Sequence, residues 1–298
     1  MSGSKHTKDV MGHGMSIRLG ENCYGKSRVR VSKVRRPRTG PANRERHELV
    51  EASVDILLSG DFETAHTEAD NTLVVATDTC KNTVYVLAKD NDLQTPESFA
   101  LALASHFLEH YEHVSKCEVT VRERVWTRLL DCDHAFTANG AMTPTAVATC
   151  ERGAAPKIVA GLEGLTVAKT TESGFENFYS DEFRTLADTD DRIFATEVSA
   201  SWPYASAEID FAECRRHVVD ALLARFVDHY SKSVQQTLYL MGQAALEACE
   251  PAESISLAMP NKHHLLVDLT PFDRNNANEV FVVTDEPYGY ITATVTRA

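Results

Sequence analysis

The chain has 298 residues, of which 43% are apolar and 24% charged, and its formal net charge is −13. This composition is typical of an ordinary globular protein of about two domains, and the negative charge argues against nucleic acid as a partner of the whole molecule. No apolar run approaches the roughly 18 residues that a membrane span needs. The seven cysteines include no Cys-x-x-Cys pair, which disfavours a structural zinc site and favours free thiols in a reducing compartment.

The N-terminal region differs from the rest of the chain. Residues 1–20 are polar and lack the apolar stretch of a signal peptide, so we expect a disordered lead. Residues 1–46 hold twelve Lys or Arg against three Asp or Glu, a bias that a nucleic-acid arm would also have. The segment 28–34 alternates polar and apolar residues, however, and this pattern favours a half-buried strand.

The first half of the chain is predicted to contain strands and one clear helix. Strands are expected at 49–58, 73–76, 83–87, 117–121 and 125–129. A helix is predicted to begin after Thr95, with Thr95 as its N-cap and Pro96 at its first position. Residues 131–155 have little periodicity and many Gly, Pro, Thr and Ala residues, so we place a boundary near residue 150.

The second half repeats this plan loosely. Strands are expected at 164–169 and 192–198, a long helical region at 211–250, and further strands at 254–257, 264–269, 280–283 and 291–295. Runs of strands beside helices predict an α+β fold with antiparallel sheets. One face of such a sheet is covered by helices, and the other needs either water or another subunit.

Few motifs of known chemistry are present. His106 and His110 fit a His-x-x-Glu-His zinc pattern on a helix, but no third ligand is indicated and the residues between them belong to an apolar stripe. A phosphate-binding Gly-rich loop, a nucleophile elbow and a dinucleotide fingerprint are all missing. The sequence therefore does not support a flavin or nicotinamide enzyme.

A more specific signal is a series of short segments in a fixed order. They are Tyr24-Gly25-Lys26, Val75-Ala76-Thr77-Asp78, Lys169-Thr170-Thr171 with Ser173 and Phe175, Asp191-Arg192-Ile193, Ser233-Val234-Gln235, Met259-Pro260-Asn261-Lys262-His263 and Asp285-Glu286-Pro287-Tyr288-Gly289. In this order and spacing the chain resembles the uricase family from about residue 22 to its C-terminus. The resemblance implies two tandem T-fold (tunnelling-fold) domains, at residues 21–155 and 156–298, each an antiparallel sheet with helices on one face. It also implies a homotetramer whose sheets form a tunnel, with active sites at subunit interfaces.

The resemblance implies a urate oxidase of purine degradation, which converts urate, O2 and water to 5-hydroxyisourate and hydrogen peroxide without a cofactor or metal. Arg192 can give two parallel donors to a carbonyl edge, Gln235 can accept and donate at once, and Phe175 can stack on the purine. The implied catalytic residues are Lys26, Thr77 and His263, and the implied substrate-binding residues are Thr77, Asp78, Phe175, Arg192, Val234 (through its backbone N–H), Gln235 and Asn261.

The implied base is Lys26, acting through the Thr77 hydroxyl. A lysine with its ordinary pKa of about 10.4 is protonated at neutral pH, so either burial or a proton relay through Thr77 and His263 must make the neutral form accessible; the sequence leaves both routes open. The resemblance implies that Thr77 and Asp78 come from a neighbouring subunit. We therefore expect Lys26 and Thr77 to meet across a subunit boundary.

Two other functions are compatible with parts of this pattern. A zinc-dependent T-fold hydrolase of pterins or purines would need Cys and His ligands, and Cys23 and Cys80 lie near Lys26 and Thr77 in sequence. An inactive purine-binding scaffold would retain the binding residues but lose Lys26 or Thr77, and both are present. The chain ends without a Ser-Lys-Leu-type peroxisomal signal, so we expect a bacterial cytoplasmic enzyme.

Overall fold

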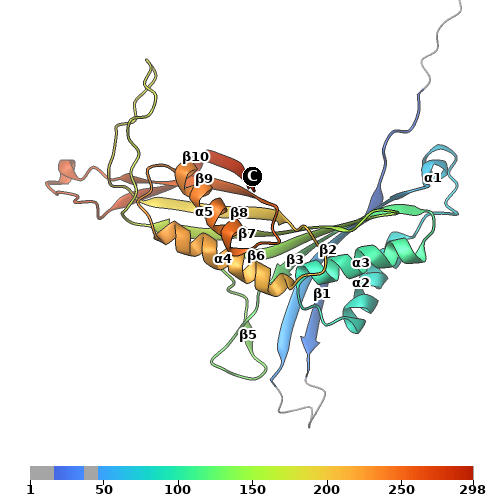
Figure 1. Cartoon of the computed structure of the whole chain (residues 1–298). Coiled ribbons are helices and arrows are strands. Elements are labelled where there is room, and N and C mark those ends of the chain that lie inside the picture. Colours follow the sequence, from blue (N-terminus) through green and yellow to red (C-terminus); the bar gives the residue numbers. More distant parts are fainter. Residues whose placement is uncertain (1–16, 37–45, 298) are drawn as a thin grey trace, which may run out of the picture.

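The computed structural model describes residues 17–36 and 46–297. The predicted disordered lead lies outside the described residues except for 17–20, which have no regular secondary structure. The main feature is one eight-stranded antiparallel sheet (Figure 1). In spatial order its strands are β1 (Tyr24–Arg35), β2 (Glu48–Gly60), β3 (Val114–Arg124), β6 (Thr143–Glu151), β7 (Lys157–Lys169), β8 (Phe194–Pro203), β9 (Ser254–Leu266) and β10 (Phe281–Thr296).

The remaining elements flank this sheet. Two short strands, β4 (Thr127–Arg128) and β5 (Phe136–Thr137), pair with each other. The helices are α1 (Glu63–Thr67), α2 (Thr77–Asp90), α3 (Pro96–His110), α4 (Phe211–Val227), α5 (Val234–Ala248) and the short 3-10 turn η1 (Thr270–Phe272). Among the described residues no helix is long and apolar enough to cross a membrane.

One face of the sheet is apolar from one half of the chain to the other. Ile56, Val119, Ala148 and Ile158 lie opposite one another on successive strands, and all four are buried. Directly paired residues share a face, so the helices of both halves cover the same side of the sheet. Helices α2 and α3 pack on the first half and α5 on the second, with α4 against α5 (Figure 1). The predicted α+β antiparallel fold is confirmed.

The two halves form a single sheet. The predicted boundary between residues 155 and 156 falls in the turn between β6 and β7, and the pairing of Ala146 with Ala160 continues the sheet across it. The apolar core is nevertheless divided into two clusters, one within residues 29–150 and one within residues 158–295. This division supports the interpretation of two domains that share one sheet.

The helix starts follow local capping chemistry. The predicted cap of α3 is confirmed, because Thr95 Oγ1 accepts a hydrogen bond from the Ser98 amide at 3.1 Å and Pro96 is the first helical residue. Asp210 accepts from the Glu213 amide at 2.9 Å at the start of α4. At the start of α5, Ser233 accepts from the Gln236 amide at 3.1 Å. Each cap satisfies a backbone donor that the helix itself leaves free.

The prediction of strands at 73–76 and 83–87 was wrong. Residues 77–90 form α2, and residues 73–76 lead into it. The β-branched and aromatic residues around Tyr85 suggested a strand, but Cys80, Val84 and Ala88 recur every fourth residue and are buried against the sheet. Tertiary burial of this helical stripe outweighs the local preference.

Other predicted boundaries also change. Residues 143–151, expected to be irregular, form strand β6, whose alternation is carried by Ala and Thr and is therefore weak in sequence. The helical region 211–250 is broken at 228–233 into α4 and α5. The four C-terminal strands merge into two long ones, β9 and β10, and β10 contains an irregularity between Thr284 and Gly289.

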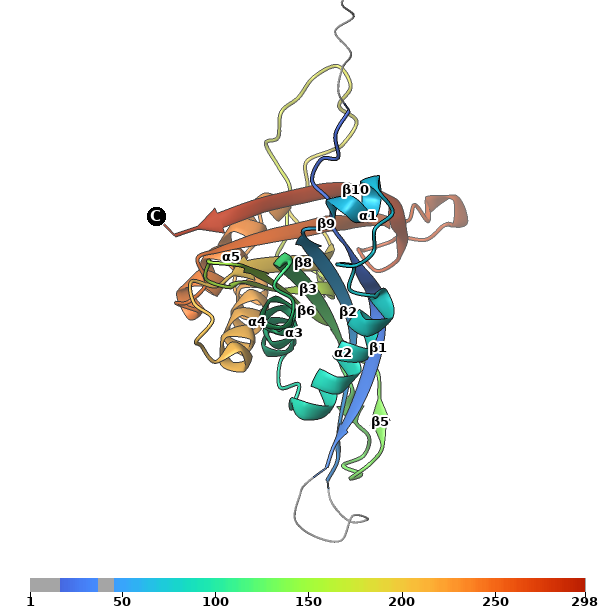
Figure 2. The same cartoon turned by 90° about the vertical axis from the view of Figure 1, so that its right-hand side faces the viewer.

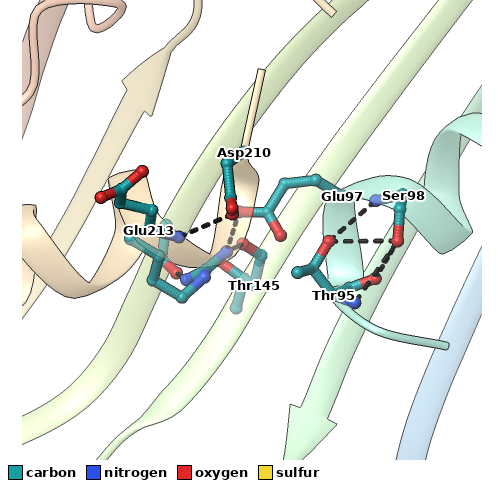
Figure 3. A network of polar contacts seen from close by, with 8 residues as sticks. Thr95, Glu97, Ser98, Thr145, Asp210 and Glu213 are labelled. Carbon is teal, nitrogen blue, oxygen red and sulfur yellow. Dashed lines mark hydrogen bonds and ion pairs between the residues drawn. The ribbon is translucent and has the colours of Figure 1, made fainter. Parts of the chain in front are cut away.

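A buried ion pair joins the two halves on the helix side of the sheet. Arg215 of α4 donates to the fully buried carboxylate of Glu97 in α3 at 2.5 Å, and to the Thr145 carbonyl of β6 at 2.8 Å. Figure 3 shows Glu97 beside the Thr95–Ser98 cap, with Thr145 and the start of α4 nearby. Burial raises the pKa of Glu97 above its ordinary value, and the charge of the Arg215 guanidinium offsets only part of this rise.

Candidate active site

A cavity of about 420 Å³ opens at the end of the sheet formed by the second half of the chain. Three segments build it: the loop 170–193 between β7 and β8, the start of α5, and strands β9 and β10. Figure 2 shows the loop standing away from the sheet on the side of β9 and β10. Six of the predicted site residues line this cavity: Phe175, Arg192, Val234, Gln235, Asn261 and His263.

Arg192 is the cation of the cavity. Its backbone amide donates to the Ser173 carbonyl at 2.9 Å, and its guanidinium carbon lies 5.3 Å from the centre of the Phe175 ring. Burial lowers the pKa of Arg192, and its Nε is buried without a hydrogen-bond partner. A partly desolvated guanidinium with an unused donor is suited to an anionic or carbonyl-bearing ligand.

The Phe175 ring and the N-terminus of α5 form the other sides of the cavity. Phe175 is half-buried and stacks on Phe178, with ring centres 4.6 Å apart. Its backbone exchanges hydrogen bonds with Thr189 at 2.7 and 3.1 Å, which fixes the ring beside Arg192. Val234 and Gln235 are the first two residues of α5. Backbone N–H groups at these positions have no acceptor within the helix, so they point a partial positive charge at the cavity.

Asn261 and His263 supply the remaining polar groups. They lie two residues apart on β9 and therefore project from the same face. The Asn261 side-chain nitrogen is 3.5 Å from His263 Nδ1. The opposite strand pairs Gly289 with Asn261 and Thr284 with His263, and its irregularity lies between these two pairs. Bulges of this kind re-aim side chains next to functional sites.

The first-half residues lie elsewhere in the chain. Lys26 is on β1 and Thr77 and Asp78 open α2, on the opposite edge of the sheet from β10. Strands β1 and β9 are six positions apart, which corresponds to roughly 29 Å at about 4.8 Å per strand. Within one chain, the open sheet therefore keeps Lys26 apart from His263.

Lys26 and α2 do lie near each other within one chain. The Tyr24 hydroxyl oxygen of β1 accepts from the Val75 amide at 2.7 Å, just before α2. The pKa of Asp78 is lowered, first by its hydrogen bond with Lys81 and to a smaller extent by the charge of Lys26. This proximity within one chain argues against the expectation that Lys26 and Thr77 meet across a subunit boundary. Both residues lie at the β1 edge of the sheet, away from the cavity residues.

Exposed apolar side chains surround the cavity. In the 170–193 loop, Tyr179 is 89% exposed and Phe183 is 82% exposed. On β9 and β10, Leu265, Val283 and Tyr290 are each more than half exposed. Apolar patches of this kind mark interaction surfaces. The sheet also ends in two long edge strands, β1 and β10, whose free backbone groups can pair with another chain.

Sequence reasoning missed several parts of this site. His264, Leu186, Asn278, Phe281 and Ile291 also line the cavity, and only the two-residue periodicity of β9 and β10 could have indicated some of them. Among the described residues no group of three His, Cys, Asp or Glu side chains is arranged to hold a metal ion. Cys23 is exposed and Cys80 is buried, and the His106 and His110 rings stack at 4.1 Å on α3. The ligand set that a zinc hydrolase needs is therefore not assembled within the described chain.

An antiparallel sheet with paired helices on one face and a purine-sized cavity at one end defines a T-fold protein. The uricase family profile matches residues 22–149 and 158–292. The crystal structure of uricase from Arthrobacter globiformis is 46% identical, covers 95% of this chain and 96% of its own, and superposes with a TM-score of 0.89. Uricase from Dictyostelium discoideum is 35% identical over 93% of this chain and 97% of its own length. Urate oxidase from Bacillus sp. TB-90, at 23% identity and a TM-score of 0.79, covers 93% of this chain and 100% of its own and shares the fold. The chain belongs to the uricase family.

Proposed function

We propose that the cavity binds urate and that the protein oxidises it with O2 and water to 5-hydroxyisourate and hydrogen peroxide, without a cofactor, in purine degradation. The uricase family consists of urate oxidases, which are oxidoreductases that use O2. The single observation that carries the assignment to this site is that six of the residues expected to bind the purine line one cavity and come from three separate segments. A volume of about 420 Å³ is in the usual range of small-molecule sites.

In this proposal the cavity recognises urate by its shape and its polar edge. Phe175 stacks on the flat ring, which is favourable for any purine face. Arg192 directs its fork of donors to a carbonyl and neutralises the urate anion. Gln235 accepts from a ring N–H while it donates to a carbonyl, and the Val234 amide adds a donor at the same edge. The unused Nε of Arg192 supports this role.

The chemistry needs a proton removed from urate so that an electron-rich species can reduce O2 directly. We assign the proton transfer to Lys26 and Thr77, with His263 completing the relay. Asn261 and Thr77 hold O2, and then water, above the ring, and Asp78 fixes the start of α2 beside them. Two electrons pass from urate to O2, the two oxygen atoms leave as hydrogen peroxide, and water supplies the hydroxyl of 5-hydroxyisourate.

Each site is proposed to form between two subunits of a homotetramer. Lys26, Thr77 and Asp78 come from one protomer, and the cavity residues come from its neighbour. The estimated separation of β1 and β9 within one chain supports this arrangement, as do the exposed apolar side chains around the cavity. We also propose a location in the bacterial cytoplasm, which suits seven free thiols.

The proposal is tested by adding purified protein to urate in air, with and without a metal chelator. We expect urate absorbance to fall with equimolar uptake of O2 and formation of hydrogen peroxide, and the chelator to have no effect. Metal and flavin analyses should find neither in stoichiometric amount. The hydrolytic alternative predicts no oxygen uptake and activity that the chelator abolishes and zinc restores. Urate binding without oxidation would indicate the scaffold alternative.

A further inference from the structure

Three hydrogen-bonded polar side chains, one half-buried and two buried, lie next to the segments that build the cavity but do not line it. His229 and Ser231 are in the turn between α4 and α5, and Thr237 faces inward from the first turns of α5. His229 Nε2 is 2.9 Å from Thr237 Oγ1, and Thr237 Oγ1 is 2.7 Å from Ser231 Oγ. Thr237 and Ser231 are both fully buried. The three residues form the His229–Thr237–Ser231 chain.

Both ends of this chain are fixed by backbone groups. His229 Nδ1 lies 2.7 Å from the Arg225 carbonyl, and because a carbonyl only accepts, Nδ1 carries a proton and Nε2 faces the Thr237 hydroxyl. The Ser231 hydroxyl donates to the Ser233 carbonyl at 3.2 Å. Thr237 is the junction, because its single hydroxyl contacts both the imidazole and Ser231. Removing that hydroxyl removes the only side-chain link between His229 and Ser231 within the described residues.

The backbone of Ser231 holds the segment that positions Arg192 and Phe175. Its amide donates to the Glu172 carbonyl at 2.8 Å, and its carbonyl accepts from the Gly174 amide at 2.8 Å. The carbonyl of Ser173, between these two residues, accepts from the Arg192 amide. Phe175 follows Gly174 directly. The segment 172–174 therefore links Ser231 to both the cation and the aromatic plate of the cavity.

The packing around this segment is tight. A Cβ on Gly174 would lie 2.2 Å from the Tyr230 hydroxyl oxygen and 2.9 Å from the Thr189 carbonyl oxygen. The Tyr230 hydroxyl itself donates to the Asp190 carbonyl at 2.6 Å. On the other side, Ser233 is the N-cap of α5, whose first residues are Val234 and Gln235. Ser231 is thus bonded to two of the three segments that build the cavity, the loop 170–193 and the start of α5.

We propose that Thr237 and His229 are positioning residues for the ligand clamp formed by Phe175, Arg192, Val234 and Gln235, and that they act through Ser231 to set the affinity for urate. The inference rests on the proposed function of the cavity. The His229–Thr237–Ser231 chain does not contact the reacting atoms. It holds the loop 170–193 and the start of α5 at a fixed separation.

The test compares two buried threonines. Thr237→Val removes the junction hydroxyl without changing the side-chain shape, whereas Thr237→Ser keeps the hydroxyl. Thr196→Val is the matched control, because Thr196 is equally buried and its hydroxyl has no hydrogen-bond partner. Urate affinity is measured under nitrogen, so that binding is separated from oxidation, and kcat and KM are then measured in air. His229→Gln is a second variant that alters the His229–Thr237–Ser231 chain.

We expect Thr237→Val and His229→Gln to weaken urate binding about 10-fold or more and to raise KM by a similar factor, with kcat changed less than about 3-fold, which is the pattern of lost uniform binding. Thr237→Ser and Thr196→Val should bind urate like the parent. If Thr237→Val does not fold, His229→Gln alone decides the result. Parental affinity in the folded variants, or an equal loss in Thr196→Val, would overturn the inference. Failure of the parent protein to bind urate would remove the proposed function as well.

Discussion

Replacing Arg192 with Ala should weaken urate binding more than any other single change in the cavity. The side chain is partly buried, burial lowers its pKa, and its Nε has no partner within the chain. The Arg192 guanidinium is therefore already partly desolvated before a ligand binds. Truncating one member of a buried, charge-assisted contact costs about 2–5 kcal/mol. This corresponds to a loss in affinity of about 30-fold to 5,000-fold, and we expect the upper half of that range.

Two further variants make the Arg192 measurement specific. Arg192→Lys keeps the charge but loses the planar fork, so it should recover only part of the affinity. Arg216→Ala removes an exposed arginine of α4 that pairs with Glu213, and it should bind urate like the parent. Binding is measured by titration with urate under nitrogen. An Arg192→Ala protein that binds urate within about 3-fold of the parent, a difference under about 1 kcal/mol, would refute the clamp assignment.

Three other predictions follow from the same structure. Arg215→Met should lower the free energy of unfolding by about 3–5 kcal/mol because it leaves the buried Glu97 carboxylate unpaired, and the Glu97→Leu/Arg215→Met double variant should recover most of this loss in denaturant titrations. Burial lowers the pKa of His229 from its ordinary 6.5, so the unfolded chain binds the proton more readily than the folded one. Stability is therefore lost as the pH falls from 6.5 through the folded pKa. The melting temperature of His229→Gln should depend less on pH over this window than that of the parent. Lys26→Met and Thr77→Ala should each lose most of the turnover, and the double variant should lose little more; additive losses in oxygen uptake would place the two residues in separate steps.

The sequence was informative where a local pattern was strong. Thr95 and Pro96 predicted the start of α3 correctly because capping depends on neighbouring residues only. The alternation at 28–34 predicted β1 for the same reason. Helix α2 was missed because Cys80, Val84 and Ala88 are weak signals on their own, and only the sheet beneath them makes their spacing decisive. Strand β6 was missed because alternation between Ala and Thr has little contrast in polarity.

The candidate site shows the same limit. Family resemblance, rather than periodicity, indicated the residues that line the cavity. Six of the nine predicted site residues line it within one chain. Which residues share a protomer depends on strand order, and strand order is a property of long-range pairing. For that reason the sequence alone could not decide whether Lys26 and Thr77 belong to one protomer. The His229–Thr237–Ser231 chain had no sequence signal, since its hydrogen bonds are created by the turn between α4 and α5.

The central claim is that each oxidation site combines Thr77 and Lys26 of one protomer with the cavity of another. It is tested most directly by reassembling two inactive variants, Thr77→Ala and Arg192→Ala, in equal amounts and measuring urate-dependent oxygen uptake. In a two-fold interface, each mixed pair contains one intact site and one doubly altered site, so random assembly should restore about a quarter of the parental activity. The parallel mixture of Thr77→Ala with Lys26→Met should restore none, because both lesions lie in the same half-site. Recovery in the second mixture, or none in the first despite mixed oligomers confirmed by mass, would contradict the account.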